Sequence, residues 1–243
     1  MHVVLICHPQ KFIYLKTHKT GSTSAELALE PFCAPPDHKI YRNRKNMLVS
    51  DYGIVGARAP GRDAIVSRTP GLFWHHMGAK RVLNIIGEET FQSYKKVACV
   101  RNPFKRLLSQ FFFKANWEKS TTTPTNLDDA RVQFRTFLMS DPNDKSNVSR
   151  VKTDYFLVHI DDRFVLDDVL RVECLEGDLN TFLRNVGIQN PTFALTRERD
   201  NANAKRDWSL MDFFDDAELV ERAIHLDEWV FRVANYSTDP REA

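Results

Sequence analysis

The 243-residue sequence predicts an α/β protein in which helices cover both faces of a parallel β-sheet. Short runs of β-branched and aromatic residues alternate along the chain with longer segments of helical period. One run, Val97–Val100, is apolar throughout, as expected of a buried parallel strand. The composition, 42% apolar and 27% charged, excludes disorder, collagen and a disulfide scaffold.

Each element follows from a local pattern. The patterns in the first part of the sequence predict a β-branched strand (11–15), a helix stopped by proline (22–30), and proline-containing loops and short strands (33–70). They then predict a helix with apolar residues at helical spacing (77–86) and a short helix (91–94). The patterns in the remaining sequence predict the apolar strand (97–100), a helix that begins with a proline (from 103) and a core-facing helix (127–138). They also predict two strands (164–165, 169–172) and two amphipathic helices (175–186, 219–230).

The length fits one domain, which we expect to span residues 1–243. No stretch approaches the roughly 20 apolar residues that a membrane-spanning helix needs. The opening run Val3–Cys7 is too short for the apolar region of a signal peptide, so we expect a cytoplasmic protein.

The cysteines Cys7, Cys33, Cys99 and Cys174 form no C-x-x-C pair, and no histidines stand near them at metal-ligand spacing. We expect free thiols, with Cys99 and Cys174 buried, and no metal site.

The charge is divided unevenly along the chain. Residues 1–119 carry 19 Lys and Arg against 8 Asp and Glu, whereas residues 120–243 carry 15 against 24. A basic first half favours an anionic ligand, although two oppositely charged halves that pack together would give the same numbers.

Two polar loops lie where a predicted strand end runs into a helix start, which is where parallel sheets bind ligands. The first, Lys16–Ser24, combines a glycine, two lysines and five hydroxyl side chains. Free N–H groups at the helix start, the helix dipole and a lysine charge favour a bound phosphate. The nucleotide-triphosphatase signature G-x-x-x-x-G-K-[ST] is absent, and helix caps beside a solvated lysine explain this loop equally well.

The second loop, Arg101–Ser109, begins at the end of the apolar strand. Arg106 and Ser109 share one helix face, and an arginine fork with a hydroxyl suits a terminal phosphate monoester. A solvated helix face is the other interpretation. Two such loops on one sheet predict a ligand with two separated phosphates.

Together the loops resemble those of sulfotransferases that use 3′-phosphoadenosine 5′-phosphosulfate (PAPS), in the branch that contains carbohydrate sulfotransferases. Phe12–Ser24 resembles the 5′-phosphosulfate loop, and Val100–Ser109 resembles the 3′-phosphate motif, an Arg-(Asn/Asp)-Pro with a serine eight residues after the arginine. The resemblance extends through Trp74–Lys80 and Leu170–Asp178 and is poor over 33–70. It implies a three-layer sandwich around a central parallel sheet, related to the nucleotide kinases, and sulfuryl transfer to a hydroxyl.

The resemblance also implies the roles of residues and ligands. Lys19 contacts the 5′-phosphate and the bridging oxygen, and Arg101 and Ser109 bind the 3′-phosphate. The phosphosulfate is held by Thr20, Gly21, Ser22, Thr23 and Ser24. The donor product is adenosine 3′,5′-bisphosphate, and no metal takes part. Gly21-Ser22 stands where Ala-Ser or Ala-Gly is more usual, which is a small departure.

The acceptor alcohol must lose a proton to a general base, and histidine is the natural base at neutral pH. Related carbohydrate sulfotransferases carry a histidine at the position of His76, so we favour His76 as the base. His75 is one alternative. Glu26 is another, because other branches use a glutamate in the helix after the first loop. Lys19 suits the charge on the leaving oxygen.

Residues 33–70 are expected to form the acceptor side. Their basic residues Arg42, Arg44, Lys45, Arg58, Arg62 and Arg68 would meet an acidic polymer, although a solvated basic loop explains them too. We expect a carbohydrate acceptor and no nucleic-acid partner. Golgi relatives carry a membrane anchor and this chain begins at Met1 without one, which favours a prokaryotic cytoplasmic enzyme. A kinase-like phosphotransferase and a non-catalytic polyanion-binding module are the rival functions.

Overall fold

The computed structural model describes residues 4–42, 44, 46–57, 73, 76–117, 123–147, 149–195 and 207–243. These residues form two compact units, one within 1–100 and 155–198 and the other within 101–154 and 199–243. Unit 1 contains the β-sheet, and unit 2 is built mainly from helices.

The strands of unit 1 are β1 (Leu5–Cys7), β2 (Phe12–Leu15), β3 (Leu48–Ser50), β4 (Gly53–Val55), β5 (Lys95–Val100), β6 (His159–Ile160), β7 (Arg163–Phe164) and β8 (Asp168–Arg171). Its helices are α1 (Ser22–Leu29), α2 (Ala79–Ile86), α3 (Glu88–Ser93), α6 (Tyr155–Val158) and α7 (Leu175–Asn185). The helices of unit 2 are α4 (Pro103–Trp117), α5 (Leu127–Met139), α8 (Ala217–Leu226) and α9 (Glu228–Ala234).

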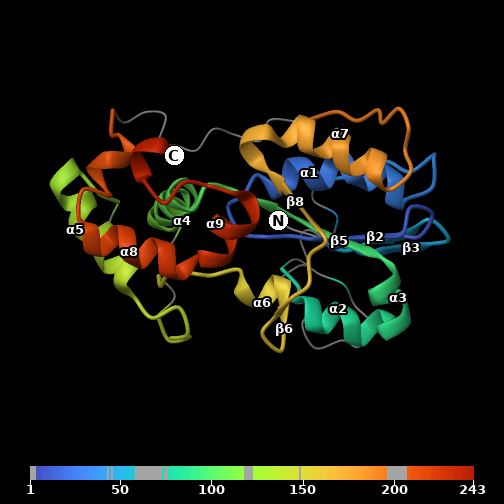
Figure 1. Ribbon diagram of the computed structural model, residues 1–243, viewed down its shortest axis with the longest axis horizontal. Helices are drawn as coiled ribbons and strands as arrows, with labels where there is room; N and C mark the ends of the chain where they lie inside the picture. The colour runs from blue at the N-terminus through green and yellow to red at the C-terminus, as the bar shows by residue number, and fades with distance from the viewer. Residues whose placement is uncertain are drawn as a thin grey trace. The chain divides into compact units, whose positions relative to one another are not determined.

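The central sheet of unit 1 has six strands in the order β3-β4-β1-β2-β5-β8. Strands β2, β5 and β8 are parallel, with Tyr14 opposite Val97 and Val97 opposite Asp168. Helices α1 and α7 cover one face, and α2 and α3 cover the other (Figure 1). The three-layer α/β prediction is therefore confirmed.

The sheet is mixed rather than parallel throughout. Strand β1 runs antiparallel to both β2 and β4, and β3 runs antiparallel to β4. The reason is the length of the connections. Only residues 8–11 separate β1 from β2, and so short a turn joins antiparallel strands, whereas a parallel pair needs a crossover of a dozen residues or more.

The core of unit 1 lies between the sheet and the helices α1 and α7. Buried side chains of the strands, such as Tyr14, Val97 and Leu170, pack with those of the two helices. Phe12 of β2 meets Phe182 of α7 edge to face, with ring centroids 5.5 Å apart. This packing holds the carboxyl end of β2, where the first polar loop begins, against α1 and α7.

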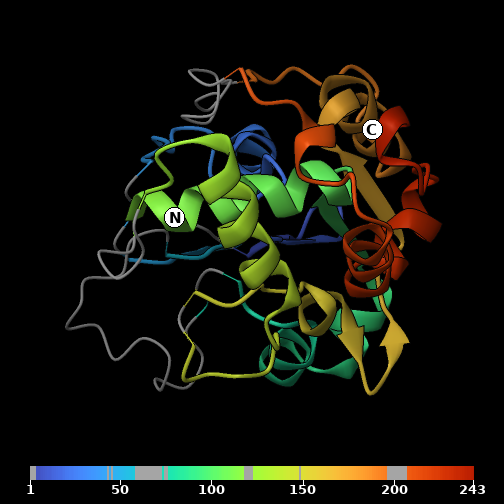
Figure 2. The same ribbon diagram turned by 90° about the vertical axis from the view of Figure 1, so that its left-hand side faces the viewer.

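Unit 2 is held together by aromatic packing. Helices α4, α5 and α8 pack on one another (Figure 2). Phe134 stacks edge to face on Phe213 and Phe214, with centroids 5.3 and 5.2 Å apart. Of the adjacent phenylalanines in α4, Phe111 and Phe112 lie in this core, whereas Phe113 is 45% exposed.

Two further expectations, one in each unit, are wrong. The apolar period over 219–230 predicted one helix, but α8 ends at Leu226 and α9 begins at Glu228. Asp227 separates them because it has non-helical dihedral angles and its carboxylate binds a buried arginine. Cys174, expected to be buried, is exposed just before α7, whereas the other three cysteines are buried and all four are free thiols.

None of the helices in the described part of the chain combines the length and apolar character needed to cross a bilayer. Within those same ranges, no three His, Cys, Asp or Glu side chains gather in a way that could hold a metal ion.

Candidate active site

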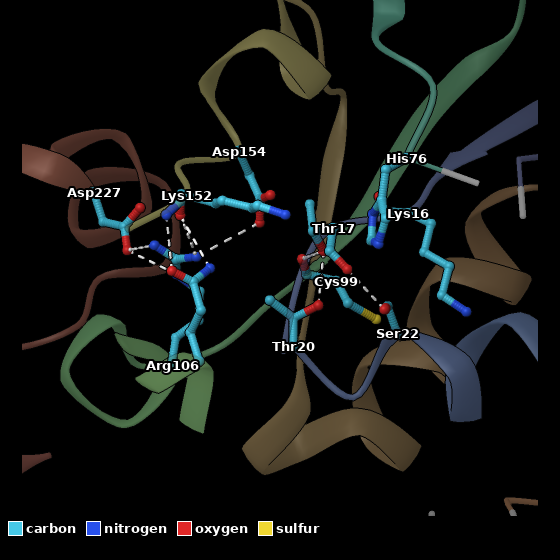
Figure 3. A network of polar contacts seen from close by, with 11 residues as sticks. Lys16, Thr17, Thr20, Ser22, His76, Cys99, Arg106, Lys152, Asp154 and Asp227 are labelled. Carbon is cyan, nitrogen blue, oxygen red and sulfur yellow. Dashed lines mark hydrogen bonds and ion pairs between the residues drawn. The ribbon is translucent and has the colours of Figure 1, made fainter. Parts of the chain in front are cut away.

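The first polar loop, residues 16–24, joins β2 to α1 and is tied to the sheet by its own hydroxyl groups. Thr17 Oγ1 donates to the carbonyl oxygen of Cys99 in β5 at 2.5 Å and lies 2.7 Å from Thr20 Oγ1. Ser22 Oγ donates to the carbonyl oxygen of Thr17 at 2.8 Å (Figure 3). Because β2 and β5 pair in parallel, both strand ends meet here, and the loop is anchored to its neighbouring strand.

Gly21 is required where it stands. Its φ is +65°, in the left-handed region, and a Cβ there would lie 2.3 Å from Cγ2 of Val172. Because a glycine precedes α1, no side chain from this position caps the first turn. The hydroxyls of Ser22 and Thr20 donate inside the loop, to the Thr17 carbonyl oxygen and to Thr17 Oγ1, so the N–H groups at the start of α1 are the donors that suit an anion.

The two lysines of the loop differ in their surroundings. Lys16 is fully buried, forms an ion pair with the fully buried Glu26, and donates to Thr23 Oγ1 at 2.9 Å. Lys19 is half-buried. Lys16 therefore holds α1 against the strand, and Lys19 is the lysine whose charge lies at the surface of the loop.

His76 is brought to this loop from 60 residues away. Its Nδ1 lies 2.9 Å from the carbonyl oxygen of Lys16 (Figure 3). Since a carbonyl oxygen only accepts hydrogen bonds, Nδ1 carries the proton, and Nε2 is the nitrogen with the lone pair. The ring of His76 also stacks on that of His18, with centroids 3.3 Å apart. His75 lies outside the described residues.

Backbone strain coincides with the two residues assigned to catalysis from the sequence. Six non-glycine residues in the described ranges have positive φ. Four stand at chain reversals or helix ends, namely Lys11 before β2, Asp161 and Asp162 between β6 and β7, and Asn235 after α9. The other two are Lys19, with φ +62°, and His76, with φ +48°. Strained backbone of this kind costs about 1–3 kcal/mol and clusters at active sites.

The second polar loop, residues 101–109, starts directly after β5 and belongs to unit 2. Asn102 Oδ1 accepts from the backbone N–H groups of Phe104 and Lys105, at 3.1 and 3.4 Å, and so caps α4. Arg101 is half-buried, and Ser109 is buried on α4.

Arg106 does not serve as an open phosphate fork, and that expectation is wrong. Its side chain is 1% exposed, and Nε and Nη2 donate to Asp227 Oδ2 at 2.8 and 2.5 Å. Nη1 donates to the carbonyl oxygen of Lys152 at 3.2 Å (Figure 3). Burial disfavours the charge, yet the carboxylates of Asp227 and Asp154 raise the pKa of Arg106 above its ordinary value. Nε, Nη1 and Nη2 of Arg106 thus all donate hydrogen bonds to partners within unit 2.

The expected acceptor side is described only in part. Arg42 is exposed, and Arg44 Nη2 lies 3.4 Å from Oε1 of the buried Glu30. The other four basic residues named for this side lie outside the described ranges, namely Lys45, Arg58, Arg62 and Arg68.

Sequence reasoning missed the supporting roles of Lys16 and Thr17. A signal for the first was present, because Thr23 and Glu26 are three residues apart on one face of a short helix that begins just after Lys16. The hydrogen bond from Thr17 to Cys99 had no local signal, since 82 residues separate the two partners.

The fold and the loop together define an α/β protein with a polar, hydroxyl-rich loop at the carboxyl end of a central strand. Comparison with protein-family models identifies it further, because the model described as "Sulfotransferase family" matches residues 2–211. The chain belongs to this family, whose members transfer a sulfuryl group from a sulfate donor to a hydroxyl-bearing acceptor. Searches of curated proteins and of solved structures gave no match.

Proposed function

We propose that this protein is a PAPS-dependent O-sulfotransferase that sulfates a hydroxyl group of a carbohydrate. One observation carries the proposal. The histidine favoured from the sequence, His76, is hydrogen-bonded to the carbonyl oxygen of Lys16, in the loop that resembles the phosphosulfate loop of the family. A candidate base and a candidate donor loop are thus adjacent although they are far apart in the sequence.

The donor loop holds the 5′-phosphosulfate. Lys19 contacts the 5′-phosphate and the bridging oxygen, and residues 20–24 donate through backbone N–H groups and hydroxyls. The uncapped start of α1 fits such an anion, and Thr23 Oγ1, which accepts a hydrogen bond from Lys16, retains its own proton for donation. Arg101 and Ser109 bind the 3′-phosphate, a role that Arg106 cannot share because Asp227 occupies its guanidinium.

The reaction is an in-line displacement at sulfur. The acceptor oxygen forms a bond to sulfur while the bond between sulfur and the bridging oxygen of the donor breaks. The alcohol proton passes to Nε2 of His76, whose Nδ1 already carries a proton. Lys19 stabilises the negative charge that develops on the departing phosphate oxygen, and no metal takes part. The products are the sulfate ester and adenosine 3′,5′-bisphosphate.

His76 is a better candidate base than Glu26. The carboxylate of Glu26 is fully buried and forms an ion pair with Lys16, which is also fully buried. Removing that carboxylate's charge by protonation would leave the lysine ammonium without its counterion in the interior, which is unfavourable. A group held in this way is poorly suited to accept a proton in each turnover.

The rest of the proposal concerns the setting of the reaction. The acceptor is a carbohydrate that the basic residues of the 33–70 segment help to bind, and no nucleic acid is a partner. We further propose one domain over residues 1–243 and a cytoplasmic, prokaryotic enzyme. The rivals are a kinase-like phosphotransferase, which needs Mg²⁺, and a polyanion-binding module, which needs neither nucleotide nor base.

Two measurements separate these functions. Isothermal titration calorimetry with adenosine 3′,5′-bisphosphate in the presence of EDTA should show binding, whereas a Mg²⁺-dependent kinase or a polyanion module should not bind it. Incubation with ³⁵S-labelled PAPS and a panel of neutral and uronic-acid-containing oligosaccharides should then label an acceptor. Calorimetric binding of ATP only with Mg²⁺, or of sulfated polymers only, would contradict the proposal.

A further inference from the structure

The imidazole rings of His18 and His76 lie face to face. Their centroids are 3.3 Å apart and their planes differ by 16°. His18 belongs to the donor loop and stands immediately before Lys19. Both histidines are half-buried. The resemblance to sulfotransferases assigns no role to His18.

The loop restrains the His76 ring in two independent ways. The hydrogen bond from Nδ1 to the carbonyl oxygen of Lys16 holds one edge of the ring. The stack on His18 holds its plane. The torsion that turns an imidazole about its Cβ–Cγ bond is intrinsically broad, so a turn about this bond can break the hydrogen bond at that edge. The stack opposes this turn and so keeps the hydrogen bond formed.

The position of His18 is in turn fixed by its neighbours. Thr17, directly before it, is hydrogen-bonded to Cys99 of β5 and to Thr20. Lys19, directly after it, has a left-handed backbone conformation. The face that His18 presents to His76 is therefore built from the same loop that is proposed to bind the donor.

We propose that His18 is a positioning residue, whose flat ring keeps Nε2 of His76 in one orientation for proton transfer. The inference rests on the proposed function, in which His76 accepts the alcohol proton. It has a specific consequence. If the stack does the positioning, the flat shape of the His18 ring is what matters, so another flat ring of similar size should replace it.

Three variants test this role, with turnover measured on the best acceptor of the oligosaccharide panel. His18→Ala removes the stack and should lower kcat by about 10–100-fold, since small misplacements of a catalytic group have effects of this size. His18→Phe retains a flat stacking ring and should stay within about threefold of the wild type. The matched control, His225→Ala on the exposed side of α8, should leave kcat unchanged. All variants should bind adenosine 3′,5′-bisphosphate as the wild type does.

The other outcomes overturn the inference. Equal loss of kcat in His18→Ala and His18→Phe would mean that an imidazole nitrogen is needed. Loss of nucleotide affinity in both would make His18 a donor contact. Unchanged kcat in both would mean that the stack does nothing.

A spectroscopic readout separates this inference from the proposed function. Long-range ¹H–¹⁵N NMR should show one His76 tautomer, protonated at Nδ1, in the wild type and in His18→Phe, and a mixture of tautomers in His18→Ala. The same spectrum in all three proteins would refute positioning even if the enzyme is a sulfotransferase. The expected spectra together with an absence of sulfate transfer would refute the proposed function alone.

Discussion

The pairing of Arg106 with Asp227 predicts a large loss of stability in Asp227→Ala. The substitution leaves a guanidinium that is 1% exposed without the carboxylate that accepts two of its hydrogen bonds, at 2.8 and 2.5 Å. Two charge-assisted hydrogen bonds contribute about 1.5–3 kcal/mol each, and removing one partner of a buried pair costs about 3–5 kcal/mol. We therefore expect the free energy of unfolding to fall by about 3–5 kcal/mol.

Urea denaturation and thermal melting measure this change. For a chain of this size, 1 kcal/mol corresponds to roughly 2–4 °C, so the melting temperature should fall by about 6–20 °C. The matched control is Asp215→Ala. Asp215 also pairs with an arginine, Arg131, but both side chains are substantially exposed. Surface pairs contribute about 0–1 kcal/mol, so the control should change stability by no more than that.

The double variant Arg106→Met with Asp227→Leu replaces the pair by apolar side chains and should recover part of the lost stability, but not all of it, because the buried Asp154, 4.0 Å from Nη1, loses its arginine. It should also bind adenosine 3′,5′-bisphosphate like the wild type, because Arg106 is a structural residue. The reasoning is refuted if Asp227→Ala is no less stable than Asp215→Ala, or if the folded double variant loses affinity for the nucleotide.

Three further predictions concern the donor site and the thiols. Arg101→Ala should weaken binding of adenosine 3′,5′-bisphosphate by roughly tenfold or more, from a lost contact of about 1.5–3 kcal/mol, without weakening adenosine 5′-phosphate; an equal effect on both nucleotides in calorimetry contradicts the 3′-phosphate assignment. Lys19→Ala should lower kcat more than donor affinity, because the charge it meets develops only in the transition state. A variant with normal kcat and only a raised donor KM would make Lys19 a binding residue. With a thiol-specific chromogenic disulfide at pH 8, only Cys174 should react in the native protein, because it alone is exposed and burial raises the pKa of Cys99 to about 12, so that Cys99 remains a thiol there. A second thiol that reacts as fast as in unfolded protein would show that the core is open.

Local patterns predicted most of the fold. Strand β5 lies where an apolar run placed it, α1 ends just before the proline expected to stop it, α4 begins at the expected proline, and α7 follows its helical period. The antiparallel strand β1 could not be predicted in the same way, because its short apolar run carries no information about its partner. The break at Asp227 depends on Arg106, which lies 121 residues earlier, and no local pattern reveals such a contact.

Residue types correctly indicated the two loops as the polar part of the sheet edge. They did not indicate which lysine and arginine side chains in the loops are paired with buried carboxylates. By residue type, Lys16 resembles Lys19 and Arg106 resembles Arg101, yet Lys16 and Arg106 are buried against carboxylates. Those carboxylates come from α1 and from the junction of α8 and α9, so the difference arises from tertiary packing. The approach of His76 to the donor loop also arises from packing, although its position along the chain resembles that of the family's histidine.

The turnover of His76→Ala compared with that of Glu26→Gln tests the central claim most directly. The account predicts that His76→Ala loses about 10²–10⁴-fold in kcat, the usual effect of removing a general base, while its affinity for adenosine 3′,5′-bisphosphate is unchanged. The wild-type rate should fall on acidification, because a protonated imidazole cannot accept the alcohol proton, and a folded Glu26→Gln should retain activity. An active His76→Ala together with a folded but inactive Glu26→Gln would contradict the account and assign the base to Glu26.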